Sequence, residues 1–404
     1  MNDTRLAIFD DDVGRWGPLT RLRPIFSQRT GMLTTHRRIE RHLNAAATAL
    51  SVPEWLAPVT AARHPQCRVN EPLPGGDWLV VNGRWLALEA AEQVAALEKG
   101  QALYDEAGHV IAARLDAAQA RDFLTTGYHT LPTQVAAKEA SISLITRPWH
   151  VLDHLPAALE ADLAATDLPA VDPHALPGVT AFGGHPLHLG ENARLDPGAI
   201  VNLENGPVVI QRGSHLQPGA VIEGPVAIGR DNQIAPHAVV RANTATGPVC
   251  KIGGEVSGSI IQAYTNKAHI GFLGDTLVGA WCNFGASTVV SNLKNTYNHV
   301  RIALDPDTEA EDTGRRHQGP IVGDLVRTAI GTRLTTGAVI DTANMLAMSR
   351  FAPKHAPPLG FYTDAGRSEH EVEKLIETAQ AMMQRRNVTM LDAEADLLRS
   401  LSSS

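Results

Sequence analysis

The sequence has little cysteine, few aromatic side chains and no long apolar run. Its three cysteines, Cys67, Cys250 and Cys282, are widely spaced and form neither a metal-ligand pattern nor a disulfide framework, so we interpret them as reduced thiols of a cytoplasmic protein. No apolar run approaches the about 18 residues that a membrane-spanning helix needs. The acidic first residues, MNDTRLAIFDDD, lack the apolar stretch of a signal peptide. These absences predict a protein of the cytoplasm without a membrane span.

Charge and composition indicate which partners and which architecture the protein is suited to. The 43 acidic residues outnumber the 35 basic ones, which argues against general binding to nucleic acid or to anionic membranes. Aromatic residues make up only 5%, whereas glycine numbers 34 and proline 25. Few rings and many turns are typical of a repetitive architecture built from small residues. The length of 404 residues allows two or three domains.

Residues 1–170 mix short strands with alanine-rich helices. The run Leu6–Phe9 predicts a strand, and the apolar spacing over Arg37–Leu50 predicts a helix. The segment Trp78–Leu86 is centred on Asn82-Gly83, a strong tight-turn signal, and therefore predicts a hairpin. Alternation of this kind favours an α/β domain. A helical connector should follow over about 150–177, where three prolines close it.

From about 178 to 350 aliphatic residues recur every six positions. Each hexapeptide would make one flat side of a triangular coil, and three sides would close one turn, with inward side chains stacked about 4.8 Å apart. The pattern predicts a left-handed parallel β-helix. An all-β sandwich would instead show alternation of period two between variable turns. The repeat starts are Leu189, Leu195, Val201; Leu216, Ile222, Ile228, Ile234, Val240; Val278, Phe284, Val290; and Val322, Thr328, Leu334, Ile340.

Two segments depart from the repeat. Residues 306–319 are polar and predict a loop that extends from one corner of the coil. The tail 368–401 has helical apolar spacing and predicts a C-terminal helix that packs on the end or side of the coil. Ser368 followed by Glu371 fits a capping box at its start.

Two motifs in the repeat region resemble a known enzyme family. KAHIGFLGD at 267–275 and WCNFGAST at 281–288 are similar to the acetyltransferase half of the bifunctional N-acetylglucosamine-1-phosphate uridylyltransferase / glucosamine-1-phosphate N-acetyltransferase family. IAPHAVVR at 234–241 and LAMSR at 346–350 are further matches. The resemblance implies an acetyl-CoA-dependent N-acetyltransferase, a homotrimer and a role in nucleotide-sugar biosynthesis, including that of UDP-N-acetylglucosamine.

The resemblance also implies roles for individual residues. His269 and Asn292 would be catalytic, with His269 as the general base. Arg241, Phe272 and Asn283 would bind the substrate, and Arg350 would contact coenzyme A. Each assignment has a structural alternative. His269 is one of seventeen histidines, the asparagines would otherwise form a ladder at coil corners, and the arginines would otherwise be solvated.

The amino-terminal part resembles a divergent branch of the same family. IFDD at 8–11, PLTRLRP at 18–24, GMLT at 31–34 and RPW at 147–149 are similar to the branch's sugar nucleotidyltransferase domain. The resemblance implies that Arg23, in the second of these segments, meets a nucleotide phosphate.

This sequence departs from the family pattern in both halves. The loop G-x-G-T-R-M is replaced by an acidic segment, and Asp10, Asp11 and Asp12 would either bind Mg²⁺ or cap the following turn. The acetyl site's expected lysine maps near Ser257 or Ser259, and its tyrosine maps to Phe272. These departures leave the amino sugar and the nucleotide open.

Three other functions remain as alternatives. The first is a sugar nucleotidyltransferase whose β-helix only serves oligomerisation and regulation. The second is a non-catalytic scaffold, and the third is a zinc enzyme. A zinc enzyme of the γ-carbonic anhydrase kind needs clustered histidines. His215, His237 and His269 stand 22 and 32 residues apart, without the close pair that such a site requires.

Overall fold

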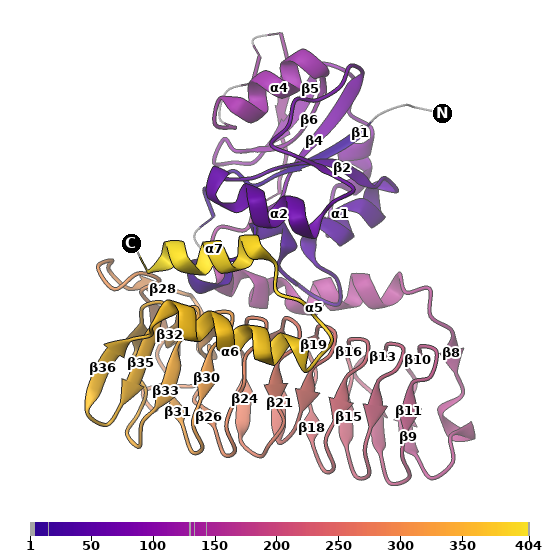
Figure 1. Cartoon of the computed structure of the whole chain (residues 1–404). Coiled ribbons are helices and arrows are strands. Elements are labelled where there is room, and N and C mark those ends of the chain that lie inside the picture. Colours follow the sequence, from indigo (N-terminus) through magenta and orange to yellow (C-terminus); the bar gives the residue numbers. More distant parts are fainter. Residues whose placement is uncertain (1–4, 15, 129–130, 133, 143, 403–404) are drawn as a thin grey trace.

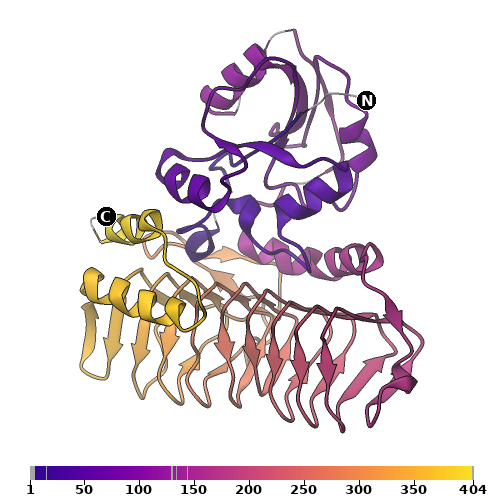
Figure 2. The ribbon, with the colours of Figure 1, turned by 45° about the vertical axis from the view of Figure 1, so that its right-hand side comes forward.

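The computed structural model describes residues 5–14, 16–128, 131–132, 134–142 and 144–402. An α/β domain sits on one side of a row of stacked coils, and two C-terminal helices run along the coils beneath it (Figure 1). The helix α5 (Pro148–Ala164) lies between the domain and the coils and carries the polypeptide from one to the other (Figure 2). The predicted fold class, an α/β nucleotidyltransferase-like domain followed by a parallel β-helix, is confirmed.

The amino-terminal domain is built on one seven-stranded sheet of order β3-β2-β1-β4-β6-β5-β7. β1 pairs in parallel with both β2 and β4, so the strand order reverses at β1. The strands are β1 (Arg5–Phe9), β2 (Ala47–Ser51), β3 (Arg68–Val69), β4 (Asp77–Asn82), β5 (Gln101–Tyr104), β6 (Val110–Asp116) and β7 (Ala136–Glu139). The helices are α1 (Thr35–Leu43), α2 (Ala57–Arg63), α3 (Ala91–Ala95) and α4 (Ala117–Thr125), with 3₁₀ turns η1 (Gly17–Leu19), η2 (Ile25–Ser27) and η3 (Glu54–Leu56).

Two local predictions in this domain need correction. The helix predicted over residues 37–50 ends at Leu43, where Asn44 adopts a left-handed cap, and Ala47–Ser51 form β2 instead. The hairpin at Asn82-Gly83 does not form, because β4 pairs with β1 and β6. Gly83 has a packing role: a Cβ there would lie 2.7 Å from the Cβ of Phe26.

The repeat region forms three sheets that run along the coil axis. Aliphatic side chains stack in register across neighbouring coils, as where Leu216, Ile234 and Ile252 succeed one another at intervals of 18 residues, or three hexapeptides. These side chains are buried, which confirms the six-residue pattern. The β-helix extends beyond the predicted 178–350, since its last coil carries β35 (Gly360–Thr363).

Each sheet collects the strands on one side of the coil, and the second and third are interrupted after β23 and after β24. The first holds β8 (Ala170–Val171), β10 (Leu187–Leu189), β13 (Val208–Ile210), β16 (Val226–Ile228), β19 (Thr244–Thr246), β22 (Ile260–Ile261), β25 (Leu277–Val278), β29 (Ile321–Val322), β32 (Val339–Ile340) and β34 (His355–Ala356). The second holds β11 (Arg194–Leu195), β14 (His215–Leu216), β17 (Gln233–Ile234), β20 (Lys251–Ile252) and β23 (Asn266–Lys267), then β30 (Arg327–Thr328), β33 (Met345–Ala347), β35 and β36 (Gly366–Glu369). The third holds β9 (Thr180–Gly183), β12 (Ile200–Leu203), β15 (Val221–Glu223), β18 (Val239–Val240), β21 (Glu255–Ser257) and β24 (Phe272–Gly274), then β26 (Val289–Val290) with β31 (Arg333–Leu334).

The two departures from the repeat have defined structures. The predicted polar loop is part of a longer insertion between β26 and β29, which carries a short hairpin of β27 (Arg301–Ile302) and β28 (Glu311–Asp312). The tail forms two helices, α6 (Val372–Gln384) and α7 (Asp392–Leu401), rather than one. The predicted capping box is absent, because Ser368 lies in β36 and donates its hydroxyl to the carbonyl of Phe361.

Ion pairs and apolar packing join the two halves of the molecule. Arg21 binds Asp341 and Arg23 binds Asp324, so the predicted nucleotidyltransferase motif at 18–24 faces the β-helix. Beside these pairs, Arg63 of α2 donates to the carbonyl of Leu22 and binds Glu394 of α7 across 2.5 Å. The C-terminal tail thereby returns from the coils to the amino-terminal domain (Figure 1). Among the described residues, no helix is both long enough and apolar enough to cross a membrane.

Candidate functional site

The predicted catalytic histidine stands at a corner of the coil between β23 and β24. His269 is exposed, and the adjacent Ile270 is 71% exposed. The corner is fixed from the interior by Lys267, whose buried Nζ donates to the carbonyls of Gly253 (2.8 Å) and His269 (2.6 Å). Burial lowers the pKa of Lys267 to about 8. The backbone of His269 is therefore held while its side chain is presented to solvent.

Phe272 and Asn292 lie together on the outer face that begins at this corner. A Cβ at Gly274 would come within 2.4 Å of Phe272 Cζ and 3.0 Å of Asn292 Nδ2, so glycine is needed for both side chains to lie over the strand. Asn292 Nδ2 donates to Asp275 Oδ2 at 2.7 Å. His269 and Phe272 thus lie on the same coil, at the corner before β24 and in β24 itself. Asn292 lies in the turn that follows β26, one coil further along the axis.

Arg241 occupies the same outer face, but its charge is already shared. Val239, two residues before Arg241, is paired in register with Glu255 of the next coil, which is paired with Phe272 of the coil after that. Arg241 Nε donates to Glu255 Oε1 at 2.7 Å, and Nη1 donates to Glu223 Oε2 at 3.2 Å. The two glutamates were not predicted from the sequence. The spacing of 18 residues between Glu223 and Arg241, one full coil, was the signal that could have found one of them.

The two positions near which the family's lysine maps, Ser257 and Ser259, differ in where they lie on the coil. Ser259 is fully buried and donates its hydroxyl to the carbonyl of Ser257 at 2.6 Å, while it accepts from Thr276 N at 3.0 Å. Ser257 is paired with Gly274 on the outer face. Of the two positions, Ser257 is therefore the one on the outer face.

Asn283 and Arg350 lie apart from this group. Asn283 belongs to the second sheet, where its Oδ1 accepts from Asn266 Nδ2 at 3.2 Å, and Arg386 in turn donates to Asn266 Oδ1. Asn283 and Asn292 therefore fall on different sides of the coil, as their spacing predicts. Arg350 follows β33, three coils beyond the His269 corner, or about 14 Å along the axis at about 4.8 Å per coil. A single copy of the protein does not bring these two residues to His269.

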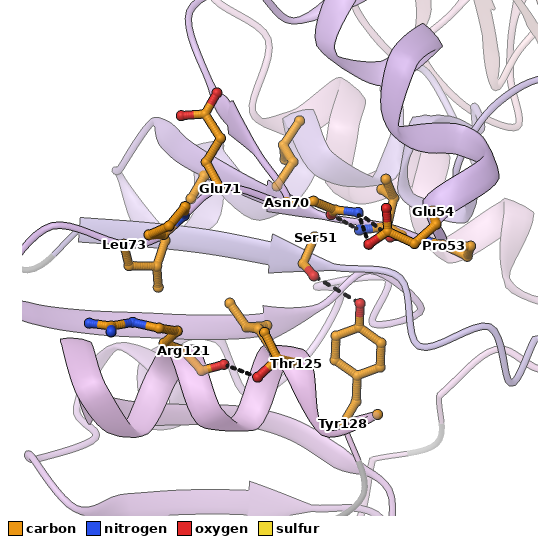
Figure 3. Close-up of a pocket in the computed structure, with 15 residues that line it drawn as sticks. Ser51, Pro53, Glu54, Asn70, Glu71, Leu73, Arg121, Thr125 and Tyr128 are labelled. Carbon is orange, nitrogen blue, oxygen red and sulfur yellow. Dashed lines mark hydrogen bonds between the residues drawn. The ribbon is translucent and has the colours of Figure 1, made fainter.

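The amino-terminal domain contains a cavity of about 440 Å³ at the carboxyl end of β2 (Figure 3). Tyr128 forms one wall, with its hydroxyl 2.8 Å from Ser51 Oγ and its ring stacked on Phe9 at 5.1 Å. Burial raises the pKa of Tyr128. Asn70 shapes the opposite side by bonding both backbone groups of Val52. Ligands of open α/β sheets bind at this edge, outside the carboxyl ends of the strands and near the reversal of strand order.

The three aspartates after β1 do not converge on a common point. Both carboxylate oxygens of Asp11 are bound by buried Arg84, at 2.6 Å from Nη2 and 2.9 Å from Nε. Asp10 is buried and accepts from the backbone N–H groups of Asp12 and Ile25. Desolvation raises the pKa of Asp10 to about 6. Only Asp12 is exposed, and desolvation raises its pKa too.

These contacts match the turn-capping alternative for Asp10 and Asp11. Within the described ranges, no group of three or more histidine, cysteine, aspartate or glutamate residues is arranged to hold a metal ion. The prediction of a three-aspartate metal site therefore needs correction, because Asp11 is occupied by Arg84. His215, one of the three histidines considered for zinc, binds Asp196 at 2.7 Å.

Arg23, for which the resemblance implies contact with a nucleotide phosphate, is paired with a carboxylate of the β-helix. Its Nη2 is 2.5 Å from Asp324 Oδ2, and its side chain is 13% exposed. Arg23 does not line the cavity beside Tyr128. It belongs to the joint between the domain and the β-helix, where the neighbouring Arg21 binds Asp341 in the same way.

The fold and these surfaces define a class: a sugar nucleotidyltransferase-like domain joined to a hexapeptide β-helix. Residues 6–168 match the family model described as sugar nucleotidyl transferase. The bifunctional protein GlmU of Methanococcus maripaludis is 37% identical over 143 residues, which cover 35% of this protein and 34% of that one. GlmU of a Nostoc species is 26% identical over 178 residues, 39% of each protein.

A third relative carries a fuller description. The bifunctional sugar-1-phosphate nucleotidylyltransferase/acetyltransferase of Sulfurisphaera tokodaii is 31% identical over 86 residues, which cover 21% of each protein. The matched segments span between about a fifth and two fifths of these three relatives. Together with the family model, these partial matches show that the protein is similar to bifunctional GlmU proteins over part of their length.

Proposed function

We propose that the protein is an acetyl-CoA-dependent N-acetyltransferase that acts on an amino-sugar phosphate or on a nucleotide sugar. The observation that supports this proposal is that Phe272 and Asn292 lie over the same strand, three residues after the exposed corner residue His269. A base, an apolar wall and an amide are the groups that an acyl acceptor needs for deprotonation, contact and orientation. The similarity to bifunctional nucleotidylyltransferase/acetyltransferase proteins supports the same conclusion.

The proposed reaction uses these groups in simple roles. The neutral amine of the sugar attacks the thioester carbonyl carbon, and the carbon–nitrogen bond forms as His269 accepts the proton of the amine. The carbon–sulfur bond then breaks and its electron pair leaves with the thiolate of coenzyme A, which takes up a proton. Asn292 holds the acceptor or the carbonyl oxygen by its amide, whose orientation is set by Asp275.

The charges around Arg241 bear on which acceptor fits. Two of the three guanidinium nitrogens of Arg241 are bound to Glu223 and Glu255, and the lysine of the family maps near Ser257 or Ser259. The face is therefore less cationic than a surface built only to hold a phosphate. We propose that Glu255, which lies next to Phe272 in the strand register, faces the amino or hydroxyl side of the sugar.

For the amino-terminal domain we propose nucleotide binding in the cavity beside Tyr128, and transfer of a nucleotidyl group that depends on Mg²⁺. Mg²⁺ is held in such sites by one or two carboxylates together with the phosphates of the substrate. Asp12 is the exposed carboxylate at the end of β1 and fits that role, whereas Asp11 is bound by Arg84. The metal would neutralise phosphate charge, which the acidic loop itself cannot do.

Two further properties follow from the resemblance. We propose that the protein works in the cytoplasm, where its small-molecule substrates are found, and that it assembles as a homotrimer. The three cysteines, which are free, agree with a reducing compartment. In a trimer a neighbouring subunit would complete the cleft, which is how Asn283 and Arg350 would come to serve it.

The test is an acetyl-CoA turnover assay against a panel of amino-sugar phosphates, with and without each nucleoside triphosphate. The proposal predicts release of free coenzyme A that depends on one amino sugar, measured by its thiol. Nucleotidyl transfer without any coenzyme A release would favour the alternative, a sugar nucleotidyltransferase whose β-helix only serves oligomerisation or regulation.

A further inference from the structure

A line of polar contacts leads from the connecting helix to the predicted acceptor face. Asp153 on α5 binds Arg315 of the insertion, with Oδ1 and Nη1 2.5 Å apart. Arg315 Nη2 lies 3.5 Å from Asp275 Oδ1. The other oxygen of Asp275 accepts from Asn292 Nδ2 at 2.7 Å. Four side chains from three separate parts of the sequence are thus joined end to end.

Arg315 is held in place at this junction. Its side chain is only 17% exposed, and its Nε donates to the carbonyl of His317 at 3.2 Å. The insertion is fixed to the same corner by its backbone, since Gln318 N donates to Asn292 O at 2.7 Å and Gly319 N donates to Asp275 O at 2.8 Å. A planar guanidinium between two carboxylates restricts the direction of each.

This arrangement determines how Asn292 presents its amide. Because Nδ2 donates one of its two N–H groups to Asp275, the amide oxygen and the second N–H are left to meet a ligand, each in a set direction. If Asp275 were free to rotate, Asn292 would lose the partner that selects this orientation. The charge on Arg315 therefore acts on Asn292 through Asp275, without touching the acceptor itself.

We propose that Arg315 is a positioning residue for the acyl-acceptor face, and that Asp153 ties its place to the connecting helix α5. The inference rests on the proposed acetyl transfer. It adds that residues outside the hexapeptide repeat, in the insertion and in α5, hold Asn292 in position. The polar insertion is then part of the site, and the helix that bears the amino-terminal domain stabilises it.

A second ion pair provides the matched control. Arg147, at the start of α5, binds Glu311 of the hairpin strand β28 at 2.7 Å. This pair joins the same two elements, α5 and the insertion, but among the described residues no hydrogen bond or ion pair links it to Asp275. Loss of the Arg147–Glu311 pair tests docking of the insertion, whereas loss of Arg315 tests positioning of Asn292.

The experiment compares steady-state acetyl transfer in four variants of the full-length protein: Arg315→Gln, Arg315→Lys, Asp153→Asn and Glu311→Gln. We expect Arg315→Gln to lower kcat by about 10- to 100-fold, because misplacement of a contacting group by about 1 Å has effects of this order. Arg315→Lys should recover part of the loss, Asp153→Asn should show a smaller one, and Glu311→Gln should equal wild type. The KM for acetyl-CoA and the thermal midpoint should stay unchanged in all four.

A kcat loss in Glu311→Gln equal to that in Arg315→Gln would overturn the proposal, and so would a loss that follows the thermal midpoint. A crystal structure of Arg315→Gln provides a test that needs no activity. We expect the contact between Asn292 Nδ2 and Asp275 Oδ2 to be lost or divided between orientations. If that contact stays intact, Arg315 is not a positioning residue, whether or not wild type transfers acetyl groups.

Discussion

Arg84 and Asp11 form an ion pair in the interior of the amino-terminal domain, with Nη2 and Oδ2 2.6 Å apart and side-chain exposures of 0% and 3%. Asn82 donates a further hydrogen bond to the same carboxylate. Desolvation by itself would raise the pKa of Asp11, but the hydrogen bonds and the charge of Arg84 outweigh it, and the pKa is lowered. The acidic loop after β1 is therefore a packed structural element, in which Arg84 neutralises the charge of Asp11.

Removal of Arg84 should strongly destabilise the protein. Arg84→Met would leave Asp11 buried without its counter-ion, which typically costs about 3–5 kcal/mol of unfolding free energy. Urea unfolding measures the change. Arg68→Met is the matched control, because its pair with Glu71 is exposed and should contribute at most about 1 kcal/mol. Equal losses in the two variants would contradict the buried-pair interpretation.

Asp10 should make stability depend on pH in the mildly acidic range. Its pKa is raised to about 6 in the folded state from 3.8, so between these values the folded protein binds more protons than the unfolded state. Stability contributed by this group therefore falls as pH rises from about 4 to about 6. Asp10→Asn removes the titration, and the difference in unfolding free energy between wild type and the variant should shift over that window. A difference that stays constant from pH 4 to pH 7 would show that Asp10 does not titrate there.

Nucleotidyl transfer by the amino-terminal domain should be weak and strictly dependent on a divalent ion. The glycine-rich phosphate loop of the family is replaced by an acidic segment, so phosphate charge must be offset by a metal. Asp12→Asn should lower the transfer rate, and chelation by EDTA should abolish it. Pyrophosphate release in a coupled assay measures both. Robust transfer in EDTA would refute this account of the loop.

A homotrimer is the expected assembly. Ile270 and Ile330 are 71% and 78% exposed at the corner between the second and third sheets, and apolar side chains this exposed are suited to burial between subunits. Sedimentation equilibrium at micromolar concentration should give three times the subunit mass of 43.2 kDa. Ile330→Asp should weaken assembly without unfolding the coil. A mass of one subunit for wild type would contradict the expectation.

The β-helix was predictable because every coil imposes the same packing requirement on the sequence. Each coil must place an aliphatic residue inward at fixed intervals, and Leu216, Ile234 and Ile252 reveal that interval directly. The turn at Asn82-Gly83 was misassigned because Gly83 serves a contact with Phe26, 57 residues away in sequence. Local patterns do not contain such distant partners.

The residues of the candidate site were named from local motifs, and their roles stay predictions. The structure brings Phe272 and Asn292 together over Gly274, and His269 stands three residues before Phe272. The pairing of Arg23 with Asp324 could not be predicted, because the two residues are 301 positions apart in the sequence. Asp153 and Arg315 meet across 162 residues, so their relation to Asn292 depends on the packing of α5 against the insertion and could not be inferred from spacing.

The most direct test of the central claim is the rate of acetyl transfer by His269→Ala. His237→Ala is the matched control, since His237 is an exposed corner histidine of an earlier coil. With the best acceptor from the panel and saturating acetyl-CoA, we predict that His269→Ala lowers kcat by about 10²–10⁴-fold, the usual contribution of a general base. His237→Ala should keep the wild-type kcat, and both variants should keep the wild-type thermal midpoint. Acetylation by His269→Ala at the wild-type rate would contradict the claim, because His269 would then be only a corner residue of the coil.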